Sequence, residues 1–447
     1  MKNLYHSDIY KFNTPVKSYW EETSNEKLNL EKLTKNINCE IVVVGGGYTG
    51  LLCAINLIEN YNLDVILIEA GKIGWGASSR NGGFCSFPPI KTSFKKLQKI
   101  YGKEETKRFF RNAVEGSNYT KDIISNYNID CDVTGESNFI VAHHPNKFKQ
   151  IKEQAEVYKN EFGIETEIYS KEEFNKFGHG GNEQFGALSY KPGFAINPLK
   201  FVNGITKYAL SKKLKIFEHT LVDKINKNNG YYTLKSKEGS VKAKKVVVAT
   251  NGFYQEGLVP QLNSRILPVI SNIIVTRKLA DKEIDLHNFK TFSPIVNTKN
   301  LLYYYRKLPD NRILFGTRGD YIGSDQSNLD RAKIMEKFFK NIFPDWAKIS
   351  IDYNWRGLIA MSQKLTPSIG KIENEEIYYG FGYHGVGVSS APWTGYQLSK
   401  LVFSNSKNLN ISKIYKGLPK KFIFPKLRIF YFRLAVLFYN IKDKLNI

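Results

Sequence analysis

Cysteine is scarce in this chain of 447 residues, which contains only four. They stand at positions 39, 53, 85 and 131 and form neither a CxxC pair nor a framework of regular spacings. Structural zinc sites and disulfide-linked scaffolds both need such clustering. The sequence therefore indicates neither class, and we predict no metal site.

Long apolar runs are also missing. No stretch approaches the roughly 18 to 20 apolar residues that a membrane-spanning helix requires. The N-terminal segment "MKNLYHSDIYKFNTPVKSYWEE" lacks the basic start and apolar stretch of a secretion signal. Together with the cysteine pattern, this predicts a cytoplasmic protein and leaves open a peripheral contact with the inner face of the membrane.

Acidic residues are few relative to basic ones. The chain has 65 Lys and Arg against 42 Asp and Glu, a formal net charge of +23. Such an excess of positive charge makes nucleic acid, anionic lipid or an anionic small molecule a candidate partner. The basic residues are mostly lysines spread along the chain, so we favour a dispersed basic surface. No basic aromatic stripe outside the C-terminal tail supports nucleic-acid binding.

Glycine, by contrast, is concentrated where a nucleotide would bind. Residues 40–44, "EIVVV", are mostly apolar and β-branched, as in a strand buried on both faces. Gly45, Gly47 and Gly50 follow in G-x-G-x-x-G spacing, and a helical run begins at Thr49. In such a unit the glycines permit a tight turn, close approach of a pyrophosphate, and packing of helix on strand. The amides at the helix N-terminus would face the phosphates.

A second apolar strand and an acid complete this unit. Residues 65–68, "VILI", lead into Glu69, which lies 19 residues beyond Gly50. A carboxylate there can accept hydrogen bonds from both ribose hydroxyls of an adenosine. Strand, glycines, helix, strand and acid arrive in order within about thirty residues. The segment therefore predicts a βαβ unit that binds the ADP half of a dinucleotide.

The segment after the acid points to a flavin. Residues 70–84, "AGKIGWGASSRNGGF", carry five glycines where a nicotinamide enzyme would continue with a plain helix and strand. This stretch resembles the flavin-contacting loop of the D-amino acid oxidase-like superfamily of FAD-dependent oxidoreductases. Within it, the stretch is most similar to glycine/sarcosine oxidase and gamma-glutamylputrescine oxidase-like enzymes. Three further segments resemble the same family: "SYW" at 18–20, "KKVVVATNGF" at 244–253 and "YYGFGYHGVGVSSAPWTGYQLSKLV" at 378–402.

The last of these segments can also be interpreted from its residues alone. "IYYGFG" predicts a strand, and Gly385 and Gly387 favour a close approach of backbone to a ligand. Ser389 or Ser390 is a candidate cap for the helix that follows. A helix N-terminus aimed at the pyrimidine edge of a flavin would stabilise the negative charge that appears there on reduction.

The resemblance implies FAD as the cofactor. Sarcosine-type members hold a flavin-tethering cysteine in the segment equivalent to 356–370, where this chain has Met361, so we expect non-covalent FAD. Motif and resemblance together predict these cofactor-binding residues: Gly45, Gly47, Tyr48, Thr49, Gly50, Glu69, Ala70, Gly76, Ala77, Ser78, Arg80, Asn81, Gly82, Gly83, Val222, Ala249, Thr250, Gly252, Gly382, Tyr383, Gly385, Val386, Gly387 and Val388.

The order of predicted elements indicates an α/β protein with two domains. One is a discontinuous Rossmann-like FAD-binding domain, in whose second piece Asn197 and Pro198 predict a helix start. The other is a substrate domain with a large, mostly antiparallel sheet and helices. The expected pieces are 1–95, 191–264 and 353–406 for the FAD-binding domain, 96–190 and 265–352 for the substrate domain, and 407–447 for a basic aromatic C-terminal helix.

The family resemblance implies an enzyme that oxidises a C–N bond. A flavin that oxidises an amine accepts hydride from the carbon next to nitrogen and leaves an imine that water hydrolyses. The protein then has to hold that carbon in place and exclude water. We predict an FAD-dependent amine or amino-acid oxidase or dehydrogenase. Strand alternation separates Tyr304 from Tyr303 and Tyr305, and Tyr305 is the aromatic candidate for the substrate site.

Arg318 and His384 complete the candidate catalytic set. If its face of the strand lines the cleft, Arg318 can pair with a substrate carboxylate; otherwise it is a solvated strand end. His384 lies inside the glycine loop and either touches ring or substrate or faces solvent.

One departure from the family bears on the electron acceptor. Several oxygen-using relatives place a lysine over the flavin's central ring from the strand equivalent to 313–318. We expect Leu314 to occupy that place here. Dioxygen and a quinone therefore both stay open as acceptors.

The C-terminal tail, residues 411–447, holds nine Lys and Arg and one acid, Asp443, interleaved with aromatics. An interfacial helix on anionic lipid and a terminal helix docked on the protein's own core both fit this pattern. We favour the docked helix, because Arg428 and Arg433 interrupt the apolar run. Two alternative functions remain: a membrane-associated, quinone-linked amino-acid dehydrogenase, and a flavoprotein that acts on a modified tRNA base.

Overall fold

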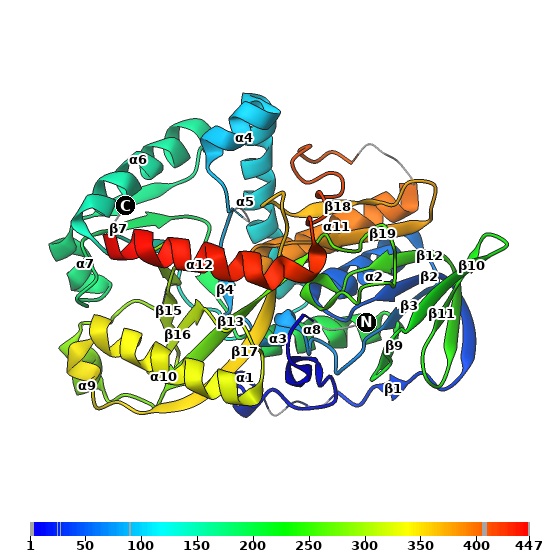
Figure 1. Cartoon of the computed structure of the whole chain (residues 1–447), viewed down its shortest axis with the longest axis horizontal. Helices are drawn as coiled ribbons and strands as arrows, with labels where there is room; N and C mark the ends of the chain where they lie inside the picture. Colours follow the sequence, from blue (N-terminus) through cyan, green and yellow to red (C-terminus); the bar gives the residue numbers. More distant parts are fainter. Residues whose placement is uncertain (1–3, 25, 27, 89–90, 405–408, 446–447) are drawn as a thin grey trace.

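Two large β-sheets, with helices on their outer faces, form the framework of the molecule (Figure 1). The coordinates, a computed structural model, describe residues 4–24, 26, 28–88, 91–404 and 409–445. The expected boundary between residues 406 and 407 lies outside this set. The first sheet occupies the right of Figure 1 and the second the left.

The first sheet has nine strands in the described residues, and its centre is parallel. Ile41 and Val43 pack in one apolar cluster while Val42 and Val44 pack in another, so both faces of the sheet are buried, as predicted. Its order is β1 (Glu31–Lys32), β9 (Lys215–Glu218), β3 (Val65–Ile68), β2 (Asn36–Val44), β12 (Ser240–Val248), β11 (Tyr231–Lys235) and β10 (Lys224–Asn228), with β19 (Ile377–Phe381) pairing to β12 and to β18 (Ser368–Lys371).

Three helices cover one face of this sheet: α2 (Tyr48–Tyr61), α8 (Pro198–Ser211) and α11 (Gly387–Ser404). Helix α8 begins where the sequence predicts, since the Asn197 side chain accepts hydrogen bonds from the N–H groups of Leu199 and Lys200. Helix α5 (Lys103–Asn126) also packs here, although we expected residues 96–190 in the substrate domain. Its Thr120 hydroxyl donates to the carbonyl of Val388 in α11 at 3.1 Å.

The second sheet has eight strands in the part of the chain described. Its neighbouring strands pair antiparallel, except for the parallel pair β14–β5, which confirms the predicted α/β fold with a mostly antiparallel second sheet. Strand β17 pairs with β13 here, although we expected it in the FAD-binding domain. The order is β17 (Ile351–Met361), β13 (Leu267–Thr276), β16 (Ile313–Arg318), β15 (Tyr304–Lys307), β14 (Ile295–Asn297), β5 (Asn138–Val141), β7 (Ala187–Tyr190) and β6 (Thr166–Tyr169).

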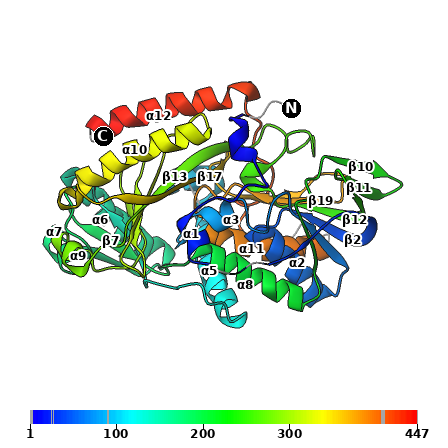
Figure 2. The ribbon, with the colours of Figure 1, turned by 90° about the horizontal axis from the view of Figure 1, so that it is seen from below.

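Helix α10 (Asp325–Ile342) covers one face of the second sheet, and the last helix, α12 (Arg428–Leu445), lies outside α10 at the edge of the molecule (Figure 2). Among the described residues, no helix is both long enough and apolar enough to cross a membrane. The remaining α-helices and strands of the described residues are α1 (Tyr19–Glu22), α3 (Ala77–Arg80), β4 (Phe84–Cys85), α4 (Phe94–Tyr101), α6 (Pro145–Phe162), α7 (Lys171–Phe177), β8 (Phe194–Ala195) and α9 (Asp281–Leu286).

Candidate functional site

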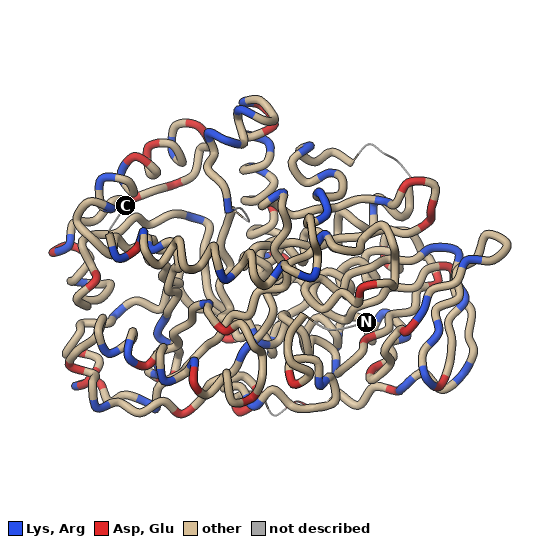
Figure 3. The backbone as a smooth tube through the Cα atoms, viewed as in Figure 1, with Lys and Arg blue, Asp and Glu red and all other residues tan. Residues whose placement is uncertain are grey.

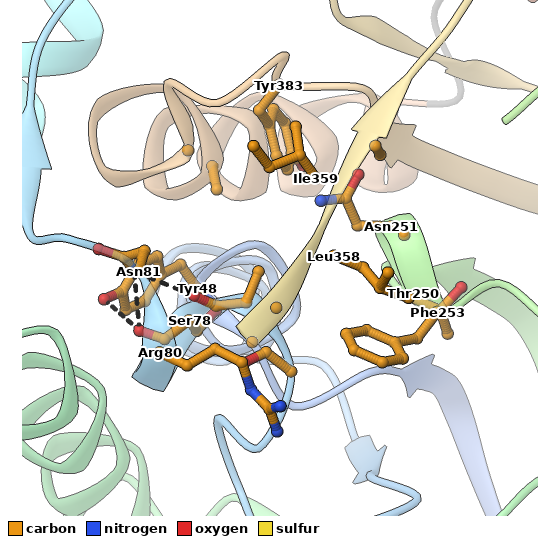
Figure 4. Close-up of a pocket in the computed structure, with 18 of the residues that line it drawn as sticks. Tyr48, Ser78, Arg80, Asn81, Thr250, Asn251, Phe253, Leu358, Ile359 and Tyr383 are labelled. Carbon is orange, nitrogen blue, oxygen red and sulfur yellow. Dashed lines mark hydrogen bonds between the residues drawn. The ribbon is translucent and has the colours of Figure 1, made fainter. Parts of the chain in front are cut away.

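A long cavity runs between the two sheets, and both contribute to its lining (Figure 4). The first sheet supplies Gly45 and Glu69 at the carboxyl ends of its strands. The second supplies Ser271 from β13 and Leu358 from β17. The carboxyl edge of a parallel sheet is the usual place for a nucleotide in such folds.

Glu69 defines one end of the cavity. Its carboxylate accepts hydrogen bonds from the N–H groups of Gly46 at 2.7 Å and Gly71 at 2.9 Å. Burial raises the pKa of Glu69 above its ordinary value, and the N–H donors of Gly71 and Gly46 oppose that rise. Val222 also lines the cavity. The carboxylate thus stands at the tip of β3, where a ribose would be recognised.

The N-terminus of α2 opens onto the same cavity. Gly47 is the N-cap and provides no side-chain hydrogen bond, and the first amide of the helix, that of Tyr48, donates to the Ser78 hydroxyl at 3.1 Å. A Cβ on Gly45 would lie 2.8 Å from the carbonyl oxygen of Ala249, and one on Gly50 would lie 1.9 Å from that of Gly45. Gly50 therefore allows α2 to pack against the end of β2.

Two residues of the first turn of α2 use their side chains to hold neighbouring segments. The Tyr48 hydroxyl donates to the carbonyls of Ser78 at 2.7 Å and Pro198 at 3.1 Å. The Thr49 hydroxyl lies 2.5 Å from the hydroxyl of Tyr383. The glycine-rich turn is thereby tied to the loop that closes the other end of the cavity.

Arg80 supports the wall of the cavity through its guanidinium. Its Nε donates to the Trp75 carbonyl at 2.9 Å and its Nη1 donates to the Arg356 carbonyl at 3.1 Å. Figure 4 shows this guanidinium directed away from Tyr48, Ser78 and Asn81. Burial, reinforced by the nearby positive charge of Arg356, lowers the pKa of Arg80 to about 9.

The closing loop follows β19 and leads into α11. Helix α11 begins at Gly387, before both predicted caps, so the expectation that Ser389 or Ser390 caps it is wrong. Both serines lie inside the first turn, and the Ser389 hydroxyl donates to the Ser86 carbonyl at 2.5 Å.

His384 is buried in this loop and does not face solvent. Its φ of +52° is the left-handed conformation that non-glycine residues seldom adopt. Its Nδ1 lies 3.3 Å from the sulfur of Met361. Burial, together with the positive charges of Lys91 and Arg318, lowers the pKa of His384 to about 3, so the ring is neutral at pH 7.

The tyrosine that lines the cavity is Tyr304, and the expectation for Tyr305 is corrected. Strand alternation turns Tyr305 to the opposite face of the sheet, where its hydroxyl lies 2.9 Å from His179 Nε2. Tyr304 reaches the cavity, and its hydroxyl lies 2.9 Å from that of Ser271. Gly316 leaves room for the ring, since a Cβ there would lie 2.0 Å from it.

Arg318 and Lys91 bring positive charge to the far end of the cavity. No hydrogen bond or ion pair of the Arg318 side chain occurs within the described residues, and its Nη2 would lie 3.4 Å from a Cβ on Gly385. Burial and repulsion by Arg318 lower the pKa of Lys91 to about 7. Among the described lining residues, Glu69 is the one acid, and it lies at the opposite, nucleotide end.

Leu314 does not occupy the place expected for it. Its side chain is fully buried in an apolar cluster with Trp20, Val275 and Trp355, away from the cavity. Strand β16 reaches the cavity through Arg318, at its end. The lysine of the cavity comes instead from the segment after β4, as Lys91.

Most predicted cofactor residues line the cavity, but three do not: Gly50, Gly83 and Gly382. Gly83 has a positive φ, and a Cβ there would lie 2.0 Å from the Ile196 carbonyl oxygen. The Gly382 N–H donates to the side chain of Asn251, which does line the cavity. These three glycines lie next to lining residues in the chain and do not themselves line the cavity.

Sequence reasoning missed several lining residues, among them Phe12, Lys91, Phe253, Ser271, Tyr304 and Leu358. Most of these come from loops or from the middle of strands without a motif. The alternation of 303–306 did carry a usable signal, because it named Tyr304 as the alternative to Tyr305.

The residues present fit an oxygen-rich ligand that carries a nucleotide. Thr250 lines the cavity, and its hydroxyl is buried without a hydrogen-bond partner in the described part of the chain. The N-terminus of α2 and the carboxylate of Glu69 line the same cavity and are the kinds of group that bind phosphates and a ribose.

Comparison with known proteins decides which ligand this is. Residues 40–401 match the family described as "DAO: FAD dependent oxidoreductase". The chain belongs to this family. The predicted resemblance is therefore confirmed, together with FAD as the cofactor and oxidoreductase as the enzyme class.

Relatives and solved structures agree with this assignment. Gamma-glutamylputrescine oxidoreductase of Escherichia coli (strain K12) is 28% identical over 437 residues, 96% of this chain and 99% of that protein. Glycine oxidase of Bacillus subtilis (strain 168) is 24% identical and covers 83% of this chain and 94% of its own length. The structure of L-proline dehydrogenase from P. horikoshii shares the fold, with a TM-score of 0.67, 21% identity, and coverage of 87% of this chain and 97% of that one.

Proposed function

We propose that this FAD-dependent oxidoreductase oxidises the C–N bond of a small amino acid and gives an imine that water hydrolyses. The observation that carries the proposal is Arg318, which lies beside Lys91 at the far end of the cavity without a partner among the described residues. A guanidinium in such a place is suited to a carboxylate. The relatives named for gamma-glutamylputrescine and glycine support a substrate with both an amine and a carboxylate.

The cofactor and the residues that line the cavity would have different roles in the reaction. Bound FAD supplies the two-electron acceptor for hydride from the substrate carbon. Arg318 would bind the carboxylate and so orient the carbon next to nitrogen. The neutral ring of His384 and the hydroxyls of Tyr304 and Ser271 would line the pocket and exclude water.

The positive end of the cavity also favours the reactive form of the substrate. An amine has to lose its proton before its carbon can give up hydride, and nearby cations lower the pKa of an ammonium group. Arg318 and Lys91 would act in this direction. A diamine without a carboxylate would bring a second cation to the same place, so we expect it to bind poorly.

The experiment is an anaerobic screen that compares amino acids with the amines obtained by removing their carboxylates. We expect amino acids to bleach the flavin absorbance of the wild-type enzyme. Arg318→Met should lower kcat/KM for the acid by about 10- to 150-fold, because a hydrogen bond to a charged group contributes about 1.5–3 kcal/mol. Activity on the matching amine should not fall. Equal bleaching by acids and amines would contradict the proposal.

Two electron acceptors are compatible with the molecule. Lys91 favours dioxygen, since a cation beside the cavity would stabilise the negative charge of reduced dioxygen. A quinone in the membrane is favoured by the exposed apolar residues of α12. After anaerobic reduction by substrate, reoxidation rates on admitting air and on adding a water-soluble quinone would distinguish an oxidase from a quinone-linked dehydrogenase.

A further inference from the structure

Helix α12 is fastened to the protein at both ends by polar contacts. Near its start, the Arg428 guanidinium pairs with Glu256 at 2.7 Å and donates to the carbonyl of Ile266. Near its end, the Asp443 carboxylate accepts hydrogen bonds from the N–H groups of Asn300 at 2.8 Å and Leu301 at 3.0 Å. The helix therefore lies along the surface in one orientation (Figures 1 and 2).

A narrow stripe of α12 faces the protein between these ends. Val436 is buried, and the Phe432 ring packs against Tyr321 with centroids 5.5 Å apart. Residues 428, 432 and 436 recur every four positions and so lie on one side of the helix. This side of α12 therefore faces the body of the molecule.

The opposite side of α12 is apolar and exposed. At 100° per residue, its outward side chains fall in a stripe roughly 120° wide, centred opposite the buried stripe. Each is between 49% and 62% exposed: Phe430, Leu434, Leu437, Phe438, Ile441 and Leu445. The usual surface helix of a soluble protein turns such a stripe inward, so this orientation is inverted.

Basic side chains flank the apolar stripe on both sides. Arg433 and Lys444 lie along one edge and Lys442 along the other, by the same helical geometry. Figure 3 shows basic residues along this part of the chain. The one acid of the tail, Asp443, is engaged on the protein side of the helix. The outward surface is therefore apolar in the middle and positive at its margins.

We propose that α12 docks the enzyme on an anionic phospholipid surface, with the helix lying in the plane of the interface. An apolar stripe with a Lys and Arg rim matches the acyl boundary below and the phosphate headgroups above. A second copy of this chain is a poorer occupant, because each carries a net charge of +23 and the same basic margins would face one another. The contacts of Arg428 and Asp443 hold α12 on the protein with its apolar stripe facing outward, so the helix does not have to detach in order to bind lipid.

The test is flotation of the FAD-loaded, full-length enzyme with vesicles of phosphatidylcholine alone and of phosphatidylcholine with phosphatidylglycerol. We expect binding to the phosphatidylglycerol vesicles that is at least tenfold stronger than to the neutral ones and that weakens as salt rises from 50 to 500 mM. The double variant Leu437→Ser, Ile441→Ser should lose at least tenfold in binding. The matched control Ile100→Ser, Leu286→Ser removes equally exposed apolar side chains elsewhere and should bind like wild type.

Separate measurements test the role of the basic margins of α12 and the identity of what covers its apolar stripe. Arg433→Gln with Lys444→Gln should bind several-fold more weakly and with less dependence on salt. Equal binding to neutral and anionic vesicles would overturn the proposal, as would unchanged binding of the serine variant. A chain that ignores vesicles but sediments as a dimer, and becomes a monomer in the serine variant, would assign the stripe to a second copy instead. Flavin absorbance of each variant shows that it is folded.

Discussion

At the scale of single residues, one step along β15 decides which tyrosine belongs to the site. Tyr304 and Tyr305 are neighbours in sequence, but they point to opposite faces of the sheet. Tyr305 is committed to a buried contact with His179, whereas Tyr304 meets Ser271 at the cavity.

Substituting each tyrosine by phenylalanine should separate the two roles. Tyr305→Phe should leave kcat/KM unchanged and lower the free energy of unfolding by about 1 kcal/mol, because one buried hydrogen bond is lost. Tyr304→Phe should lower kcat/KM and leave stability nearly unchanged. Steady-state kinetics and denaturant unfolding measure both effects, and the reverse pattern would show that the cavity face has been misassigned.

Lys91 gives the site a second residue-scale property, a dependence on pH. Its pKa of about 7 means that the side chain is cationic below pH 7 and neutral above it. KM for an amino-acid substrate should therefore rise by about fivefold between pH 6 and pH 8, if one screened charge contributes about 1 kcal/mol. Lys91→Met should have the higher KM throughout and lose this step. A step of equal size in the variant would assign the titration to another group.

At the scale of elements, residues 45–50, which join β2 to α2, have to meet two requirements: close packing of the helix and room for the ligand. Gly50 serves packing, since the atom nearest to a Cβ there is a backbone oxygen at 1.9 Å. Gly47 serves the ligand, since the nearest atom is the movable Ser78 hydroxyl at 2.8 Å. The two glycines of one motif are thus expected to fail in different ways.

Alanine substitutions test this difference. Gly50→Ala should lower the stability of the apo-protein by about 1–3 kcal/mol or prevent folding, because backbone atoms cannot yield. Gly47→Ala should change apo-protein stability little but weaken FAD binding at least tenfold, because its methyl group takes the space of the pyrophosphate. Thermal unfolding and FAD titration distinguish the two. Equal loss of FAD affinity in two equally stable variants would contradict the prediction that Gly50 and Gly47 have different roles.

Elements also show where local patterns are insufficient. The start of α8 at Asn197 and Pro198 follows from local capping chemistry, and the sequence predicts it correctly. Helix α5 and strand β17 have equally clear local patterns, but their partners, α11 and β13, are distant in sequence. Domain boundaries drawn from the order of elements therefore stay predictions.

At the scale of the whole molecule, the cofactor cavity is closed by segments more than 300 residues apart, as in the contact between Thr49 and Tyr383. The described lining residues include no cysteine. We therefore expect acid precipitation of the purified enzyme to release essentially all of its FAD into the supernatant. Yellow colour retained in the washed pellet would show a covalent link through another side chain.

The amino-acid sequence alone determined the family, the cofactor and the nucleotide end of the site, because glycine spacing, a buried strand and Glu69 are close together in the chain and act through backbone geometry. Tertiary structure alone decided that Tyr304 and Lys91 reach the cavity, that Leu314 does not, and that α12 turns its apolar side outward. These facts depend on which faces of distant elements meet, and no local spacing encodes that packing.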